Sequence, residues 1–245
     1  MPMQNRLLAT LPEGDLRALK QYMQTVLLRY QTVLYEPGDR LTHIYFPDEG
    51  VICKGALDGA GRMVGTAIVG ADGMVGAFAA LDGLQEQSRA FVHVQGTAST
   101  IGIDALRRIA LENRAIGAML HSYCRYLYVC GQHAAVCNAS HTLEQRLCLS
   151  LVRLHHLSQR RMIEVTQEQL GEWLAVKRTS VCFIAHGMQE RGLIRVRRGK
   201  IEIIDLEGLT RSSCNCHRFL SSYYDSLFNT NVASKSVDSM MLAKV

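Results

Sequence analysis

The chain has 245 residues, a length that suggests one or two domains. With 48% hydrophobic and 20% charged residues its composition is that of a globular protein, and no apolar run approaches the roughly 20 residues of a transmembrane helix. The net charge of +5 is unevenly placed: residues 1–141 hold 12 basic and 12 acidic side chains, whereas residues 142–218 hold 13 basic and 8 acidic. The C-terminal part therefore has the charge expected of a segment that meets a polyanion.

The cysteines and the N-terminus suggest a compartment. Eight cysteines at irregular spacing are few for a disulfide framework in a chain of this length, and the first 15 residues show no secretory pattern. We therefore expect reduced thiols in a cytoplasmic protein that has no membrane partner.

Residues 7–23 are predicted to be helical, and the sequence changes character from residue 25 to residue 102. That stretch is rich in Val, Ile, Gly and Tyr, and its short apolar runs are separated by turn signals such as Glu36-Pro37-Gly38-Asp39. Many short strands at near-regular spacing predict a small antiparallel barrel or roll. The runs expected to be strands are 33–35, 43–46, 51–53, 63–69, 90–94 and 97–101.

A long helix is predicted to begin at a cap, Asp104, and to run to about Ser140. Seven of its residues follow one another in alternating steps of four and three, which is the spacing of a coiled-coil seam. We expect this seam to pair two copies of the chain as a parallel homodimer; the alternative is one amphipathic stripe that packs on the roll. Because Tyr, Cys and Ala make a weak zipper, the roll should add contacts. The seam residues are Ile116, Leu120, Tyr123, Leu127, Cys130, Ala134 and Cys137.

Cysteines suggest two further sites, neither of which the sequence favours. Cys130 and Cys137 would each approach their own copy across the dimer axis, so a redox switch is possible there, but a buried cysteine is more simply a small apolar residue. Cys214-x-Cys216-His217 carries ligand-type side chains without a matching second pair, so we predict no metal site.

After a helix predicted at 142–157, residues 166–191 have the pattern of two short helices joined by a tight turn. Apolar residues from Leu170 to Ile184 are spaced to enter one core. Thr166 is a natural N-cap for the first helix, and Gly171 would let the two backbones approach where they cross. The pattern is that of a helix-turn-helix, with an ordinary helical hairpin as the alternative.

The second helix of this pair opens on polar and basic residues, the end that a helix-turn-helix presents to the major groove. Residues 193–204 alternate apolar and polar on both sides of Arg198-Gly199, which predicts a β-hairpin with a basic tip. This completes a winged helix whose tip should contact phosphates, unless the charges are simply solvated. The residues expected to contact DNA are Thr166, Gln167, Lys177, Arg178, Thr179, Ser180, Phe183, Arg197, Arg198 and Lys200.

Residues 206–228 should close the fold with one or two short helices, and residues 229–245 should form a flexible tail. Gly-x-Ser-x-Gly, paired catalytic carboxylates and His-Glu-x-x-His are all missing from the sequence, and the glycines at 70–76 lack the Lys-Ser/Thr of a nucleotide loop. We therefore predict an α+β protein without a catalytic site: a sensor roll (1–103), a dimerisation helix (104–141), a winged helix (142–228) and the tail.

This order of parts resembles the superfamily of the cyclic-AMP receptor protein and the fumarate-nitrate reductase regulator (Crp/Fnr), over about residues 5–218. The residues that carry the resemblance lie at 34–38, 44–50, 69–76 and, most specifically, 166–194. The resemblance implies a dimeric bacterial transcription regulator. Its roll would sense a signal, its long helix would transmit it, and its winged helix would bind double-stranded DNA with two-fold symmetry, with RNA polymerase as a further partner.

The nucleotide site of the family is altered in this sequence. Members that bind cyclic AMP use a Gly-Glu-Leu turn for the ribose and an Arg-Ser pair for the phosphate, whereas this chain has Gly76-Ala77-Phe78 and Ser88-Arg89. These five residues mark a possible effector pocket in which Arg89 could still reach a phosphate. Without the ribose-binding carboxylate, however, we expect activity that does not depend on cyclic AMP.

Other family cofactors are also not expected. The oxygen-sensing members hold an iron–sulfur cluster through N-terminal cysteines, and no cysteine precedes Cys53. His43 and His93 are single histidines in strand-like runs, which does not suggest haem ligation.

The recognition helix departs from the family as well. Members often carry a Glu and a later Arg that read base edges, where this chain has Thr179 and Phe183. Arg178 remains and could contact a guanine or a phosphate, so the preferred site should differ from those of both archetypes. The rival interpretation is a small-molecule sensor whose winged helix mediates protein contacts, and the basic excess argues against it. These residues do not specify the effector, the target genes or the sign of regulation.

Overall fold

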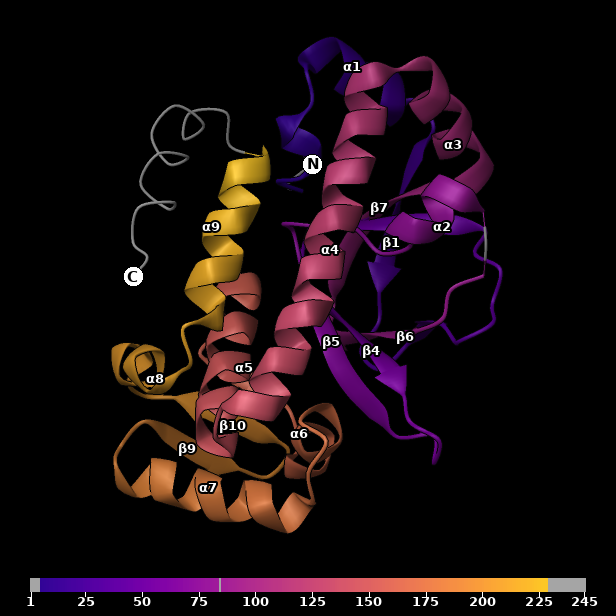
Figure 1. Cartoon of the computed structure of the whole chain (residues 1–245). Coiled ribbons are helices and arrows are strands. Elements are labelled where there is room, and N and C mark those ends of the chain that lie inside the picture. Colours follow the sequence, from indigo (N-terminus) through magenta and orange to yellow (C-terminus); the bar gives the residue numbers. More distant parts are fainter. Residues whose placement is uncertain (1–4, 84, 229–245) are drawn as a thin grey trace, which may run out of the picture.

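A computed structural model describes residues 5–83 and 85–228 (Figure 1), so the tail predicted at 229–245 lies outside the described residues. The chain begins with the 3-10 turn η1 (Leu8–Thr10) and helix α1 (Glu13–Lys20). One continuous helix over 7–23 is therefore wrong. Pro12 precedes α1, and it forces Leu11 into an extended conformation with ψ of 146°.

The predicted roll is confirmed as two antiparallel sheets, with strand orders β1-β7-β3 and β2-β6-β4-β5. All six expected runs are strands, and β1 is an additional one that the sequence analysis placed partly in the first helix. Apolar side chains from both sheets, such as Leu28, Ile52 and Val92, form the core between them, whereas Ile44 and Phe46 of β3 pack with the helices. The strands are β1 (Met23–Leu28), β2 (Val33–Tyr35), β3 (His43–Pro47), β4 (Val51–Leu57), β5 (Met63–Val69), β6 (Arg89–Val94) and β7 (Gly96–Gly102).

His93 on β6 should make the protein less stable in acid. It is buried, and this burial lowers the pKa of its imidazole to about 4, against about 6.5 in an unfolded chain. Unfolding therefore takes up a proton as the pH falls below 6.5, so the stability present at neutral pH is lost between pH 6.5 and 4. We expect the free energy of unfolding to fall by about 2 kcal/mol from pH 7 to pH 5 through this group.

Urea unfolding of His93→Phe at both pH values tests this expectation. The variant should lose most of that difference, although His217, whose pKa burial also lowers to about 4, will keep a part of it. The same substitution at exposed His43 is the control. An unchanged pH dependence in His93→Phe would contradict the assignment.

Helix α2 (Ala77–Asp82) lies within the roll, between β5 and β6, and two helices, α3 (Ile103–Glu112) and α4 (Arg114–Ser140), join the roll to the C-terminal part. The continuous helix predicted from Asp104 to Ser140 is therefore wrong, because Asn113 interrupts it with an extended backbone. The Asn113 side chain caps α4 by accepting from the Ile116 amide at 3.0 Å, and it donates to Asp15 at 2.6 Å. Asp104 lies in the first turn of α3 and is not its cap, which is Gly102.

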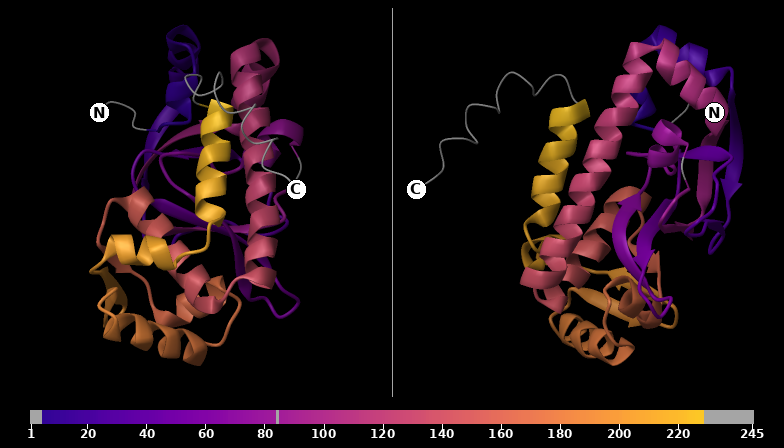
Figure 2. Two further views of the ribbon diagram at one scale, coloured as in Figure 1. Left: turned by 60° about the vertical axis from the view of Figure 1, so that its left-hand side comes forward. Right: turned by 45° about the vertical axis from the view of Figure 1, so that its right-hand side comes forward.

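The seam predicted on α4 faces the interior of the chain itself. Six of its seven residues are buried, and Ala134 is half-buried. The last helix, α9 (Cys216–Phe228), runs beside α4 in both views of Figure 2, and the rings of Tyr123 and Phe228 lie 6.4 Å apart. The seam is thus not an exposed stripe of the single chain, because the roll and α9 cover it.

The remaining elements form the predicted winged helix. Strand β10 lies between β8 and β9, and all pairs are antiparallel. Helix α5 begins with a capping box in which the Thr142 and Gln145 side chains each accept from the other's backbone amide. The elements are α5 (Leu143–Ser158), β8 (Met162–Glu164), α6 (Gln167–Trp173), α7 (Arg178–Glu190), β9 (Ile194–Arg197), β10 (Lys200–Ile203), α8 (Leu206–Ser212) and α9.

The winged helix is packed against the roll. Trp173 at the end of α6 lies over Gly65 of β5 so closely that a Cβ there would come within 2.3 Å of the indole ring. Arg153 of α5 forms an ion pair with Asp72, which follows β5. The position of the winged helix therefore depends on contacts with the roll as well as on α4. Among the helices of the described residues, none is long and apolar enough to cross a membrane.

Candidate nucleic-acid interface

The helix-turn-helix has the local geometry that the sequence predicts. Thr166 caps α6, and its hydroxyl accepts from the Gln169 amide at 3.1 Å while the Gln169 side chain accepts from the Thr166 amide at 2.8 Å. Gly171 is needed where the helices cross, because a Cβ there would lie 2.9 Å from the Val176 carbonyl oxygen. Ala175 closes the turn with a φ of 56°, a conformation that glycine usually adopts. The local geometry of the helix-turn-helix is thus determined mainly by its own sequence.

The residues that open α7 face solvent, whereas its opposite side is in the core. Lys177, Arg178 and Thr179 are exposed, and Ser180 is half-buried. Phe183, one turn further, leaves 78% of its surface exposed. A phenyl ring exposed to water on this helix could contact the methyl group of a thymine. This apolar contact would replace the base-reading arginine that the resemblance leads one to expect at this position.

A groove between α6, α7 and the hairpin β9–β10 collects most of the predicted DNA-contacting residues. The other predicted contacts, Lys177, Thr179, Ser180 and Phe183, do not line this groove. Glu168 is the acidic member that the sequence analysis did not name. The polar and charged lining residues are Thr166, Gln167, Glu168, Arg178, Arg197, Arg198 and Lys200.

Carboxylates already pair several of these cations. Glu202 accepts from Arg197 at 3.0 Å and from Arg195 at 3.5 Å, and Lys200 lies 3.0 Å from Glu164. The hairpin register places Glu202 opposite Arg195, so this pair could have been found from the sequence, whereas Glu164 comes from β8 and could not. Exposed pairs of this kind contribute only about 0–1 kcal/mol, so a phosphate could replace the carboxylates.

Among the cations that line this groove, Arg178 and Arg198 have the weakest pairing with carboxylates. Arg178 is 4.0 Å from Glu168, at the limit of an ion pair, with both side chains more than 60% exposed. Arg198 takes part in no ion pair among the described residues. These two guanidinium groups are therefore the readiest to bind a phosphate or a guanine.

The five residues of the predicted effector pocket are not brought together. Phe78 and Ser88 line a hollow in the roll, while Ala77 is buried and Gly76 caps α2 with a φ of 95°. Arg89 forms a bidentate ion pair with Glu36, with its Nε and Nη2 both 2.8 Å from carboxylate oxygens, and this hydrogen bonding raises the pKa of Arg89. The cation that could bind a phosphate is thus already neutralised.

The hollow contains an ion pair that the sequence analysis missed. Lys54 and Glu86, both more than 90% buried, are 3.1 Å apart, and the Lys54 ammonium lies 5.4 Å from the centre of the Phe78 ring. The sequence does not indicate this pair, because Lys54 lies on β4 and Glu86 lies in the connection between α2 and β6. The pair compensates the charge of Lys54, while a second cation, Arg40, also lines the hollow.

The two seam cysteines differ in their surroundings. Cys130 lies in the core between α4 and the roll, and burial raises the pKa of its thiol to about 11, which disfavours the reactive thiolate. Cys137 instead packs with Cys214 and Cys216, which lie just before α9 and at its first residue. His217, which the sequence grouped with these cysteines, points elsewhere, and its ring lies 5.3 Å from that of His156.

Comparisons with known proteins agree with this geometry. The model of the Crp-like helix-turn-helix domain matches residues 145–212, and no curated protein matches the sequence. A transcriptional regulator of the Crp/Fnr family from Eubacterium rectale has a similar structure with a TM-score of 0.68 and 15% identity, over 84% of this chain and 96% of that one.

Two further solved structures are similar over nearly their whole length. FixK2 from Bradyrhizobium japonicum gives a TM-score of 0.66 and 13% identity, over 78% of this chain and 98% of that one. The c-di-GMP-responsive regulator CLP of Xanthomonas campestris gives 0.66 and 14%, over 79% and 100%. Residues 145–212 therefore form a Crp-like helix-turn-helix domain, and the chain has the fold of Crp/Fnr regulators.

Proposed function

We propose that this chain is a Crp/Fnr-type transcription regulator that binds DNA sequence-specifically as a homodimer in the cytoplasm, has no enzymatic activity and works with RNA polymerase. The observation that carries the proposal is the groove between α6, α7 and the β9–β10 hairpin. It gathers Thr166, Gln167, Arg178 and the basic hairpin tip in one place, on a domain that matches the Crp-like helix-turn-helix.

The proposed dimer uses the side of α4 that residues 5–83 and 85–228 leave exposed. Exposed residues on this helix again follow steps of three and four, so they form one stripe. Tyr128 and Val136 on this side keep 63% and 48% of their surface exposed, which is unusual for apolar residues on a long helix. Binding to a two-fold site would require the recognition helices of the two copies to lie about 34 Å apart, one turn of DNA. The stripe comprises Ala118, His121, Arg125, Tyr128, Gln132, Ala135 and Ala139.

Selection of DNA from a random library tests sequence specificity and the dimer together. The purified, reduced, full chain should enrich a motif with two-fold symmetry and half-sites one helical turn apart. Enrichment of a single half-site would contradict the dimer, and no enrichment at any salt concentration would contradict sequence-specific binding.

Arg178 is expected to contribute directly to specificity. Replacing it with Ala should weaken binding to the selected site by about 1–3 kcal/mol, because a guanidinium that reads a guanine makes two hydrogen bonds at once. Titration by fluorescence anisotropy on the selected site and on scrambled DNA measures this. Arg211→Ala on α8, also an exposed arginine, is the control. An equal loss on scrambled DNA would instead make Arg178 a phosphate contact.

We also propose that the regulator does not depend on cyclic AMP, and the roll supports this proposal. The turn at Gly76 offers no carboxylate for a ribose, and Arg89 is held by Glu36. Saturating cyclic AMP should therefore leave the affinity for the selected site unchanged in the same titration. A clear increase in affinity would show that Arg89 can leave Glu36 for a phosphate.

A further inference from the structure

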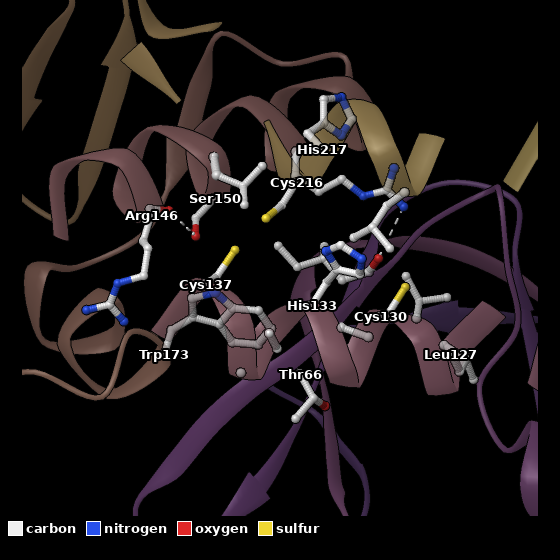
Figure 3. Close-up of a pocket in the computed structure, with 18 of the residues that line it drawn as sticks. Thr66, Leu127, Cys130, His133, Cys137, Arg146, Ser150, Trp173, Cys216 and His217 are labelled. Atoms are coloured by element: carbon white, nitrogen blue, oxygen red, sulfur yellow. Dashed lines mark hydrogen bonds between the residues drawn. The ribbon is translucent and has the colours of Figure 1, made fainter. Parts of the chain in front are cut away.

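Four ligand-type side chains meet where α4 ends and where α8 is joined to α9. The Sγ atoms of Cys137, Cys214 and Cys216 and a ring nitrogen of His141 all lie within 4.8 Å of one another. Three of them are buried, with exposures of 8%, 4% and 7%, and His141 is half-buried. Figure 3 shows the sulfurs of Cys137 and Cys216 directed toward each other at one end of a cavity between α4, α5 and α6.

The distances within this cluster fit the edges of a tetrahedron around a metal ion. Zn²⁺ binds sulfur at about 2.3 Å and histidine nitrogen at about 2.0–2.1 Å, so tetrahedral ligands would be about 3.8 Å apart for two sulfurs and about 3.6 Å for sulfur and nitrogen. The observed separations are 3.6 Å between Cys137 and Cys214 and 3.8 Å between Cys216 and the Nδ1 of His141.

The local structure explains how these four residues come together. Cys137 and His141 are four residues apart at the C-terminal end of α4, so both lie on one side of the helix. Cys214 lies in the connection between α8 and α9, and Cys216, two residues later, is the first residue of α9. The second pair that Cys214-x-Cys216 lacks in the sequence is thus supplied by Cys137 and His141, and His217 is not part of it.

The four side chains have few other polar partners. The partly buried Leu149 packs against the three buried sulfurs, and Cys137 and Cys216 also line the cavity shown in Figure 3.

We propose that Cys137, His141, Cys214 and Cys216 form a binding site for one Zn²⁺ ion, or for another thiophilic divalent ion of the same geometry. Four protein ligands complete the coordination, so the site is structural and leaves no position for a substrate. Binding of the ion releases the protons of the three cysteine thiols, and neither sulfur nor the metal changes its oxidation state. The ion would fasten α9 and the end of the winged helix to α4, the helix proposed to form the dimer.

The first test is metal binding by the full, reduced chain in the absence of DNA. After removal of metal with a chelator, titration with Co²⁺ should give the intense visible bands of tetrahedral cobalt with thiolate ligands, at one equivalent per chain, and Zn²⁺ should displace them. Weak octahedral bands, or no saturation at one equivalent, would overturn the proposal.

Variants then locate the ion. Cys137→Ser and His141→Asn should each weaken Zn²⁺ binding by more than about 100-fold, since even loss of an outer-shell partner costs about 10- to 100-fold. Cys130→Ser is the matched control, because Cys130 lies on the same helix with the same 8% exposure and outside the cluster. An equal loss in Cys130→Ser, or unchanged binding in Cys137→Ser, would refute the assignment.

A measurement on the unmodified chain guards against variants that do not fold. Zn²⁺ should raise the melting temperature of the chelator-treated chain, because it binds the folded state preferentially. Peptide mapping of the chain purified without added reductant should show no Cys137–Cys214 disulfide, and a disulfide found in place of bound metal would overturn the proposal. None of these readouts involves DNA, so the metal site and the proposed function can fail separately.

Discussion

Replacing Arg197, Arg198 and Lys200 together with alanine should weaken DNA binding about 100-fold at near-physiological salt, which is about 2.7 kcal/mol. The three residues form the tip of the β9–β10 hairpin at the edge of the groove, where they would contact phosphates on both specific and random DNA. Each such contact releases counterions and contributes about 0.9 to the slope of log affinity against log salt concentration. The slope should therefore fall by up to about 2.7.

The structure makes the contributions of the three residues unequal. Arg197 and Lys200 must leave Glu202 and Glu164 to reach a phosphate, whereas Arg198 has no such partner among the described residues. The single variant Arg198→Ala should consequently lose more affinity than either of the other two. Anisotropy titrations at several salt concentrations separate these effects.

A triple variant of equal charge on the roll is the control for this prediction. Arg6, Arg17 and Lys20 are all exposed, and helix α1, which holds the last two, lies at the opposite end of the molecule from α7 (Figure 1). Alanine at these positions changes the net charge by the same amount. The control should alter the salt dependence only slightly. If both triple variants lost the same affinity, the effect would come from net charge and the assignment of the hairpin would be wrong.

Arg153→Met should lower the free energy of unfolding by about 3 kcal/mol, towards the lower end of the cost of breaking a buried ion pair. Arg153 donates to Asp72 at 2.5 Å, and the two side chains keep 21% and 8% of their surface exposed. Removing the guanidinium leaves the carboxylate buried, with a hydrogen bond from the Gly70 amide at 3.2 Å as its remaining partner. Methionine keeps the aliphatic contacts, so the loss reports mainly on the charge.

Urea denaturation of the variant and of two others tests this explanation. Arg17→Met breaks the ion pair between Arg17 and Glu13, whose side chains are 74% and 85% exposed, and it should cost less than about 1 kcal/mol. In Arg153→Met/Asp72→Asn, neutralising the stranded carboxylate should restore part of the stability. Equal losses in Arg153→Met and Arg17→Met would contradict a buried pair between α5 and the roll.

The parts of the site that lie close in sequence were predictable from it. The cap at Thr166, the close approach at Gly171 and the basic hairpin tip each depend on residues within one turn or one hairpin. The groove between them follows, because two helices and a hairpin joined by short connections have little freedom in how they pack. The carboxylates that pair its cations were harder to see, since Glu164 comes from a strand far from Lys200 in sequence.

The heptad pattern of α4 shows which structural features a sequence repeat predicts and which it does not. The residues from Ile116 to Cys137 are apolar at a helical repeat, so one side of the helix had to be buried. Which surface buries it is not encoded in the repeat. In the structure that surface is the roll together with α9, where the Tyr126 and Tyr224 rings meet at 5.2 Å, and the side left for a second copy carries Tyr128 and Val136.

The sequence by itself determined the order of parts, the roll, the helix-turn-helix with its hairpin, and the excess of basic residues, because turns, caps and apolar periodicity act over a few residues. The tertiary structure alone decided which side of α4 is covered, that Arg89 is held by Glu36, and that Cys137 and His141 meet Cys214 and Cys216. These contacts join residues 53 to 77 positions apart. Such contacts form only when whole elements pack, and local sequence patterns do not specify that packing.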